Sequence, residues 1–147
     1  MAQLSKFDER MFEKAKEVAE TSDFEHFHLG CVITYKHHIL SAASNSSKTH
    51  PRQKYYNYKY RNFRRGPKPC AHTIHAEMAA INAIPYPIGI QVNWKEVNVY
   101  VYRIAPGLPQ HRGTARPCAA CMAALKNLGI RNIYYTTDEG FAYERLD

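Results

Sequence analysis

Two alanine-rich segments, each opening with chemically reactive side chains, constrain the fold of this chain more than any other feature. The segment "HAEMAAINAI" begins with His75 and carries Glu77, and the segment "CAACMAALKNL" begins with Cys118 and carries Cys121. Prolines follow the first segment and a glycine follows the second, so both are predicted to be helices that stop there. A spacing of three residues places the two cysteines on one face of a helical turn, about 5–6 Å apart at Cβ, which suits one tetrahedral metal ion. We therefore expect the two helix starts to face each other around a metal.

His75 can supply a third ligand to this ion. Three protein ligands with one position left to solvent are typical of a catalytic zinc site, whereas a structural site has four protein ligands. Cys70 and His72, just before the first helix, are the nearest candidates for a fourth ligand, and Cys31 is predicted to be a small core residue in an apolar strand. The alternative, that the cysteine pair is only small packing residues, is disfavoured by the presence of His75. We expect one Zn²⁺ per chain.

Glu77 is placed among small apolar residues that are predicted to be buried, where a carboxylate needs a partner. One interpretation is stabilisation of the first helical turn by the helix dipole, which is worth under about 1 kcal/mol. The other is a general base beside a water molecule at the metal. Because residues two positions apart do not share a helical face, Glu77 can flank the metal without binding it. The occurrence of the His75–Glu77 pair together with a C-x-x-C favours the second interpretation.

The hydrophobic pattern along the rest of the chain predicts an α/β fold with a mixed sheet of four to five strands. We expect helices at about 6–20, 75–84 and 118–128, and strands at about 29–35, 37–44, 96–104 and 130–137. The first two strands should form an antiparallel hairpin, and the two strands that flank the last helix should be parallel. Residues 138–147 are interpreted as a short tail, and residues 48–68 show too little regular pattern to assign an element.

The net charge of +7 is concentrated in residues 48–68, which contain eight basic residues and no acidic one. The rest of the chain therefore sums to −1, and an anionic partner is expected close to the histidine–glutamate helix. Within this segment, "KYYNYKYRNFRR" alternates aromatic and basic residues, as proteins that bind single-stranded nucleic acid do. A solvated basic face and an oligomer contact are the alternatives.

The chain has no run of eighteen apolar residues, and its first twenty residues are charged and amphipathic, unlike a signal peptide. These features predict a cytoplasmic protein without a membrane partner, in which cysteines stay reduced and a C-x-x-C binds metal. The length fits one domain over 1–147, with the basic segment 48–68 as an insertion within it.

At the histidine–glutamate pair and the C-x-x-C, the sequence resembles the zinc-dependent cytidine and deoxycytidylate deaminase superfamily, whose signature is H-x-E followed by P-C-x-x-C. The two halves are His75-Ala76-Glu77 and Pro117-Cys118-Ala119-Ala120-Cys121. The resemblance covers roughly residues 30–136 and implies a three-layer α/β/α, cytidine-deaminase-like fold. With histidine at position 75, the chain is more similar to deaminases of deoxycytidylate, guanine, tRNA adenosine or DNA than to deaminases of free cytidine, which usually have cysteine at this position.

The resemblance implies roles for individual residues. His75, Cys118 and Cys121 would bind zinc, and Glu77 would take a proton from water and pass protons to the ring nitrogen and the departing amino group. Substrate contacts implied in the same way are Asn45, Ala76, Phe27 and His28. A simple turn asparagine is the alternative for Asn45. Relatives are often homo-oligomers, so a homo-oligomer is also implied.

The substrate is less constrained than the reaction. The connection over 104–116 is longer than is usual in the family, and the basic segment is also unusual. Candidate contacts to phosphate or nucleic acid are Arg52, Lys54, Tyr58, Arg61, Arg64, Arg65 and Arg116. Three hypotheses follow: a deaminase of cytosine in a nucleotide such as deoxycytidylate; a deaminase of cytosine or adenine in single-stranded DNA or RNA; and a non-catalytic zinc module that binds nucleic acid. Other aminated heterocycles also stay open as substrates.

Overall fold

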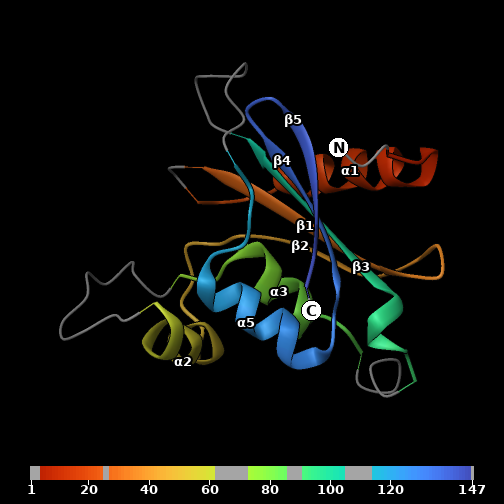
Figure 1. The fold of residues 1–147 in the computed structure, drawn as a ribbon. Helices are drawn as coiled ribbons and strands as arrows, with labels where there is room; N and C mark the ends of the chain where they lie inside the picture. Colours follow the sequence, from red (N-terminus) through yellow and green to blue (C-terminus); the bar gives the residue numbers. More distant parts are fainter. Residues whose placement is uncertain (1–3, 25–26, 62–72, 86–90, 105–113, 147) are drawn as a thin grey trace.

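A mixed five-stranded sheet forms the centre of the protein (Figure 1). The computed structural model describes residues 4–24, 27–61, 73–85, 91–104 and 114–146. The strands are β1 (His28–Tyr35), β2 (His38–Ser44), β3 (Val97–Ile104), β4 (Asn132–Thr137) and β5 (Gly140–Arg145), in the spatial order β2-β1-β3-β4-β5. β3 and β4 are parallel and the other neighbouring pairs are antiparallel. The predicted hairpin and the predicted parallel pair are therefore confirmed.

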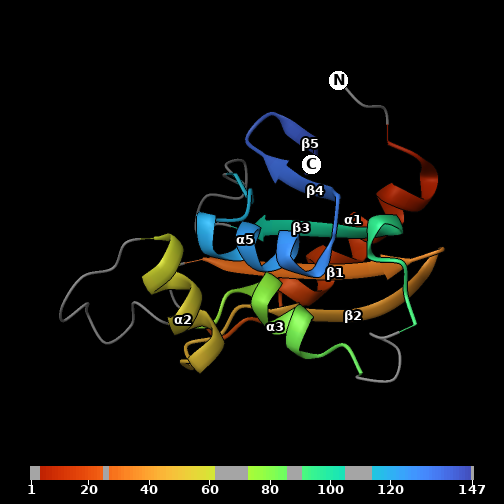
Figure 2. The same ribbon diagram turned by 60° about the horizontal axis from the view of Figure 1, so that its bottom comes forward.

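Helices cover both faces of this sheet, which confirms the three-layer α/β/α arrangement (Figures 1 and 2). The helices are α1 (Lys6–Ala19), α2 (Pro51–Tyr60), α3 (Ala76–Asn82) and α5 (Ala119–Leu128), with a short 3₁₀ helix η2 (Trp94–Glu96) before β3. α1 packs against the sheet through Val32 and Tyr100, whereas α3 and α5 pack on the opposite face. The two faces arise because successive strand residues point to opposite sides, so Cys31 and Ile33 belong to the core under α3 and α5.

Local signals in the sequence explain where the first elements begin and turn. Ser5 caps α1 in a reciprocal capping box with Asp8, as an N-cap serine followed by an acid three residues later does. Lys36 and His37 both have positive φ angles, of 49° and 67°, and connect β1 to β2. Two such residues match the right-handed twist of a tight hairpin.

Two elements differ from the sequence prediction. Residues 51–60, for which no element was predicted, form α2. The side chains that this helix buries are Gln53 and Asn57, so it lacks the apolar stripe by which amphipathic helices are recognised. The segment interpreted as a tail contains β5, which pairs with β4 at the edge of the sheet. In the described part of the chain, none of the helices combines the length and the apolar character needed to cross a bilayer.

The fold brings the chemically important segments to one edge of the sheet. Phe27 leads into β1 and Asn45 follows β2. Arg103 is the residue before the end of β3, and its partner on β1 is Leu29. The starts of α3 and α5 lie at this same edge, as predicted from the order of the elements (Figure 2). Carboxyl ends of parallel strands are a common position for binding sites in α/β proteins.

Candidate active site

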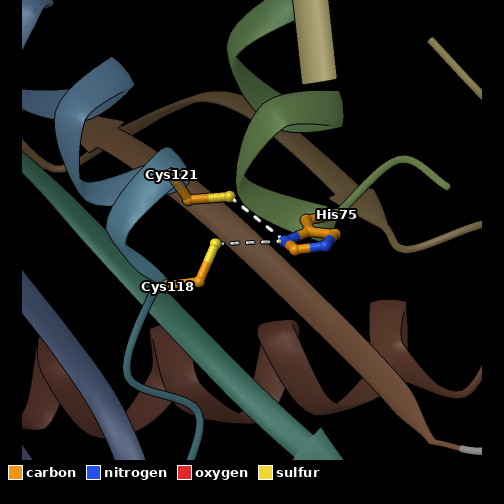
Figure 3. A group of neighbouring side chains, drawn as sticks. All are labelled: His75, Cys118 and Cys121. Atoms are coloured by element: carbon orange, nitrogen blue, oxygen red, sulfur yellow. Dashed lines mark hydrogen bonds between the residues drawn. The ribbon is translucent and has the colours of Figure 1, made fainter. Parts of the chain in front are cut away.

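His75, Cys118 and Cys121 form a compact group at the starts of two helices (Figure 3). His75 is the N-cap of α3 and Cys118 is the N-cap of α5, with Cys121 one turn further along α5. The Nδ1 atom of His75 lies 3.5 Å from Sγ of Cys118 and 3.4 Å from Sγ of Cys121. Zinc–sulfur and zinc–nitrogen bonds of ordinary length at a tetrahedral angle give an N···S separation of about 3.6 Å. The three side chains are therefore positioned to bind one metal ion.

The electrostatics of the two thiols also favour a cation. Hydrogen bonding to Cys121 and to His75 lowers the pKa of Cys118 far below its ordinary value, although burial opposes this shift. The hydrogen bond with Cys118, burial and the charge of Glu77 raise the pKa of Cys121. The two thiols cannot both be ionised at this separation unless a positive charge lies between them, and a divalent ion supplies that charge. The donor set fits Zn²⁺, which binds thiolate and imidazole ligands.

The surroundings of His75 shift the pKa of its imidazole in opposing directions. Burial lowers the pKa of its imidazole, but the hydrogen bond to Cys118 and the charge of Glu77 outweigh burial, so the pKa lies above its ordinary value. Cys31 is fully buried in the core, as predicted, and burial keeps the pKa of its thiol well above the ordinary value. The two alternative ligands named from the sequence, Cys70 and His72, lie outside the described residues.

Glu77 lies in the first turn of α3 with only 3% of its surface exposed. Its Oε1 atom has no hydrogen-bond partner among the described residues. Burial raises the pKa of this carboxyl group to about 7, while the charge of His75 opposes the rise. A cation held by the three ligands would lower the pKa again, because opposite charge favours the carboxylate. A buried, unpaired acceptor next to a metal group is an arrangement that core packing alone does not require.

Gln53 of α2 holds the backbone of His75 and was not predicted from the sequence. The His75 N–H donates a hydrogen bond of 3.0 Å to Oε1 of Gln53, and Nε2 of Gln53 donates one of 3.0 Å to Oδ1 of Asn57. Both α2 side chains are fully buried. The basic helix α2 is thus attached to the metal group through a polar contact.

We expect Gln53→Ala to weaken zinc retention by about tenfold, since partners that orient metal ligands typically contribute about 10–100-fold to metal affinity. The measurement is the rate at which a coloured chelator removes zinc from the protein. Tyr56→Phe is the matched control, because it removes a hydrogen bond of 3.1 Å between α2 and Asn127 of α5 without touching His75. Equal rates in Gln53→Ala and the wild type would show that Gln53 has no influence on the metal group.

A small cavity of about 140 Å³ opens beside the metal group. Its lining residues are Phe27, Leu29, His75, Glu77, Arg103, Thr114, Ala115, Arg116 and Cys118. Phe27 and Arg116, two of the predicted substrate or phosphate contacts, are among them, together with His75, Glu77 and Cys118. Arg116 is held in a bidentate ion pair by Glu144, with Nε–Oε1 and Nη2–Oε2 distances of 3.1 and 2.9 Å. This pairing fixes the orientation of the Arg116 guanidinium at the cavity.

Three other residues predicted to contact substrate do not line this cavity. Ala76 is fully buried in the core, and His28 begins β1. The side chain of Asn45 is buried and bonded to protein: Oδ1 accepts from the Leu29 N–H at 2.9 Å and the Ser22 hydroxyl at 2.6 Å, and Nδ2 donates to the Phe27 carbonyl at 3.2 Å. Asn45 therefore fixes the Phe27–Leu29 wall of the cavity, and a direct substrate contact stays a prediction for all three residues.

The predicted phosphate contacts of the basic segment lie on α2, outside the cavity. Arg52, Lys54 and Tyr58 are exposed on this helix, and Arg61 forms its C-cap. Arg64 and Arg65 lie outside the described residues. None of these α2 residues lines the cavity, so their contacts to phosphate or nucleic acid stay predictions.

Arg103 is the cavity residue that sequence reasoning missed most clearly. It is a cation near the end of a strand composed mainly of apolar and aromatic residues, and it lies at the edge of the sheet where binding sites form. That combination of charge and position was the available signal. Gln53 gave none, because a glutamine in a basic, aromatic segment does not indicate burial.

Comparison with protein families gives one match. The model described as "Cytidine and deoxycytidylate deaminase zinc-binding region" matches residues 5–137. The match extends from α1 to the end of β4 and includes all three residues of the metal group and Glu77. A search of individually curated proteins found no match.

Proposed function

The chain belongs to the cytidine and deoxycytidylate deaminase family, and on that basis we propose that it is a zinc-dependent hydrolase that removes the exocyclic amine of cytosine in a nucleotide, releasing ammonia. The observation that carries this proposal is the buried Glu77 carboxylate, with Oε1 unpaired among the described residues, beside the His75–Cys118–Cys121 group and a cavity. The family match supports the reaction class, and the cytosine nucleotide is the finer part of the proposal.

The proposed chemistry assigns a separate task to each part of the site. His75, Cys118 and Cys121 would hold a zinc ion, which when bound supplies a Lewis acid that lowers the pKa of water towards neutrality. Glu77 accepts one proton of that water and passes it to the ring nitrogen. It then moves the second proton of the same water to the amino group, which leaves as ammonia while the water oxygen takes its place on the ring carbon. Phe27 and Leu29 form an apolar wall against which a flat base can pack. Burial keeps Glu77 away from bulk solvent, so its proton goes to the substrate.

The size of the cavity supports a single base as the group that enters it. Pockets for ligands of drug size have volumes of about 300–1,000 Å³. The cavity beside Glu77 measures about 140 Å³, which suits one heterocyclic ring. Sugar and phosphate would then remain near the opening. A purely structural zinc module has no use for such a cavity or for an unpaired carboxylate at its base.

A second candidate function, deamination within single-stranded nucleic acid, is favoured by the surface of α2. Tyr55, Tyr58 and Tyr60 expose 56%, 44% and 36% of their surface, respectively. Exposed aromatic rings next to cations can stack on bases and neutralise phosphates. However, Lys59 already lies over two of these rings, with Nζ 5.7 Å from the Tyr55 centroid and 5.5 Å from the Tyr60 centroid. Two of the three exposed rings therefore have a partner within the helix, and we favour the nucleotide.

Ammonia release from a panel of substrates distinguishes a nucleotide substrate from single-stranded nucleic acid. The zinc-loaded protein is incubated with deoxycytidylate, deoxycytidine, and single-stranded oligonucleotides that contain cytosine or adenine. We expect turnover of deoxycytidylate and little turnover of the oligonucleotides. Release from oligonucleotides alone, with an affinity that falls steeply with salt, would instead support the second candidate. Oligonucleotide binding without ammonia from any substrate would identify a non-catalytic module.

A further inference from the structure

Arg103 occupies an unusual position in the cavity beside the metal group. Its guanidinium lies over the ring of Phe27, with Cζ 4.9 Å from the ring centroid. Its Nε atom is buried and has no hydrogen-bond partner among the described residues. Arg103 and Phe27 both line the cavity, so the aromatic ring holds the guanidinium plane at the place where substrate would enter.

The charge of Arg103 is not compensated within the described residues. Arg116 is paired with Glu144, whereas no described carboxylate lies within 4.0 Å of the Arg103 guanidinium. Among the residues that line the cavity, Glu77 is the acidic one. A buried N–H of a cation without an acceptor is costly unless a ligand supplies that acceptor. The two arginines of the cavity thus differ, since one is neutralised by the protein and the other is not.

We propose that Arg103 is a specificity-determining residue that binds the phosphate of a mononucleotide substrate, so that the nucleotide is preferred over the nucleoside. The inference rests on the proposed function and adds to it the residue that selects the substrate. Guanidinium offers N–H groups in a planar fork that matches two phosphate oxygens, and stacking on Phe27 holds that fork in place. The cavity admits one ring, so a phosphate attached through the sugar lies outside it and can be reached by a residue of the rim.

The position of Arg103 favours a phosphate on the reacting nucleotide over the backbone of a long strand. The exposed cations of α2, such as Arg52 and Lys54, form no part of the cavity lining, whereas Arg103 lies beside the residues that would contact the base. A single half-buried guanidinium suits a single phosphate. A polynucleotide track would instead use many exposed cations.

The test compares Arg103→Ala and Arg103→Lys with the wild type on deoxycytidylate, deoxycytidine and a short oligonucleotide that contains cytosine. We expect Arg103→Ala to lower kcat/KM for deoxycytidylate by about 10–100-fold, mainly through KM, as loss of a charged hydrogen bond does. Turnover of deoxycytidine should change less than about twofold, since a nucleoside lacks the group that Arg103 binds. Arg103→Lys should recover part of the loss, because lysine keeps the charge but not the fork.

Arg10→Ala is the matched control. Arg10 also lies over a phenylalanine, with Cζ 5.8 Å from the ring centroid of Phe7, but it belongs to α1 on the other face of the sheet. Its loss should leave both substrates unaffected. Equal losses for deoxycytidylate and deoxycytidine in Arg103→Ala would overturn the proposal, because they would mean that Arg103 contacts the base or only supports the wall. A loss confined to the oligonucleotide would overturn the assignment to a mononucleotide.

Binding without turnover separates this inference from the proposed function. Calorimetry on the Glu77→Gln protein compares deoxycytidylate with deoxycytidine, with and without the additional Arg103→Ala change. Tighter binding of the nucleotide that disappears with Arg103→Ala would support Arg103 even if the wild type released no ammonia, in which case only the proposed reaction fails. Equal affinity for nucleotide and nucleoside when Arg103 is intact would overturn the role of Arg103, whatever the turnover.

Discussion

Glu77→Gln should lower kcat for deamination by about 10²–10⁴-fold, the contribution of a general acid–base group, while the zinc content stays that of the wild type. Glutamine has the same shape as glutamate but cannot accept and return a proton at neutral pH. The melting temperature should not fall, because Oε1 of Glu77 has no hydrogen-bond partner among the described residues that the change could break. Ammonia release, zinc analysis and thermal unfolding of the same preparation measure the three quantities.

Glu139→Gln provides the control for this substitution. Glu139 is exposed in the turn between β4 and β5, so the same chemical change there should leave activity intact. If Glu77→Gln retained at least half of wild-type turnover with bound zinc, Glu77 would not be the proton carrier. If it lost zinc together with activity, Glu77 would have a role in holding the metal that the three-ligand arrangement does not assign to it.

Cys118→Ala should abolish stoichiometric zinc binding and, with it, the stabilisation that zinc gives. Removal of one of three ligands leaves a thiol and an imidazole, which hold zinc much less tightly. A ligand present at about 1,000 times its dissociation constant stabilises the folded state by about 4 kcal/mol. We therefore expect the melting temperature of the wild type to rise when zinc is added after chelation, and that of Cys118→Ala to stay unchanged. Differential scanning calorimetry with zinc analysis provides the measurement.

Cys31→Ala separates the metal role of a cysteine from its packing role. Cys31 is fully buried on β1. We expect the Cys31→Ala protein to be somewhat less stable than the wild type but to keep its zinc. Full zinc content in Cys118→Ala would contradict the ligand assignment. Loss of zinc in Cys31→Ala would also contradict it, because the thiol on β1 would then have to take part in the site.

The metal group could be predicted from the sequence because its geometry is local. A cysteine pair three residues apart at a helix start is positioned by the helix itself, so Cys118 and Cys121 needed no knowledge of the fold. The placement of His75 next to them required only the order of helices and strands and the rule that parallel strands share an edge. The N-terminal helix and the hairpin had equally local signals, a capping box and a two-residue turn.

The residues that shape the site could not be predicted in this way, because their roles depend on contacts distant in the chain. Gln53 lies 22 residues from His75 in sequence and is buried by a helix whose inner face is polar. The substrate contact expected of Asn45 stays a prediction, whereas its bonds to Phe27 and Leu29, which fix a cavity wall, were not indicated by the sequence. Arg103 depends on the pairing of β3 with β1, which brings it to Phe27. Periodicity and motif spacing carry no information on such pairings.

Zinc-edge X-ray absorption spectroscopy of the purified protein, together with elemental analysis, tests most directly whether one ion is held by His75, Cys118 and Cys121 beside Glu77. We predict one zinc per chain with two sulfur donors, the remaining donors being nitrogen or oxygen. Addition of deoxycytidylate to the Glu77→Gln protein should perturb the spectrum without changing the number of sulfur donors. A protein that neither contains nor takes up zinc, or a site with three or four sulfur donors, would contradict the assignment of the centre and the proposed chemistry with it.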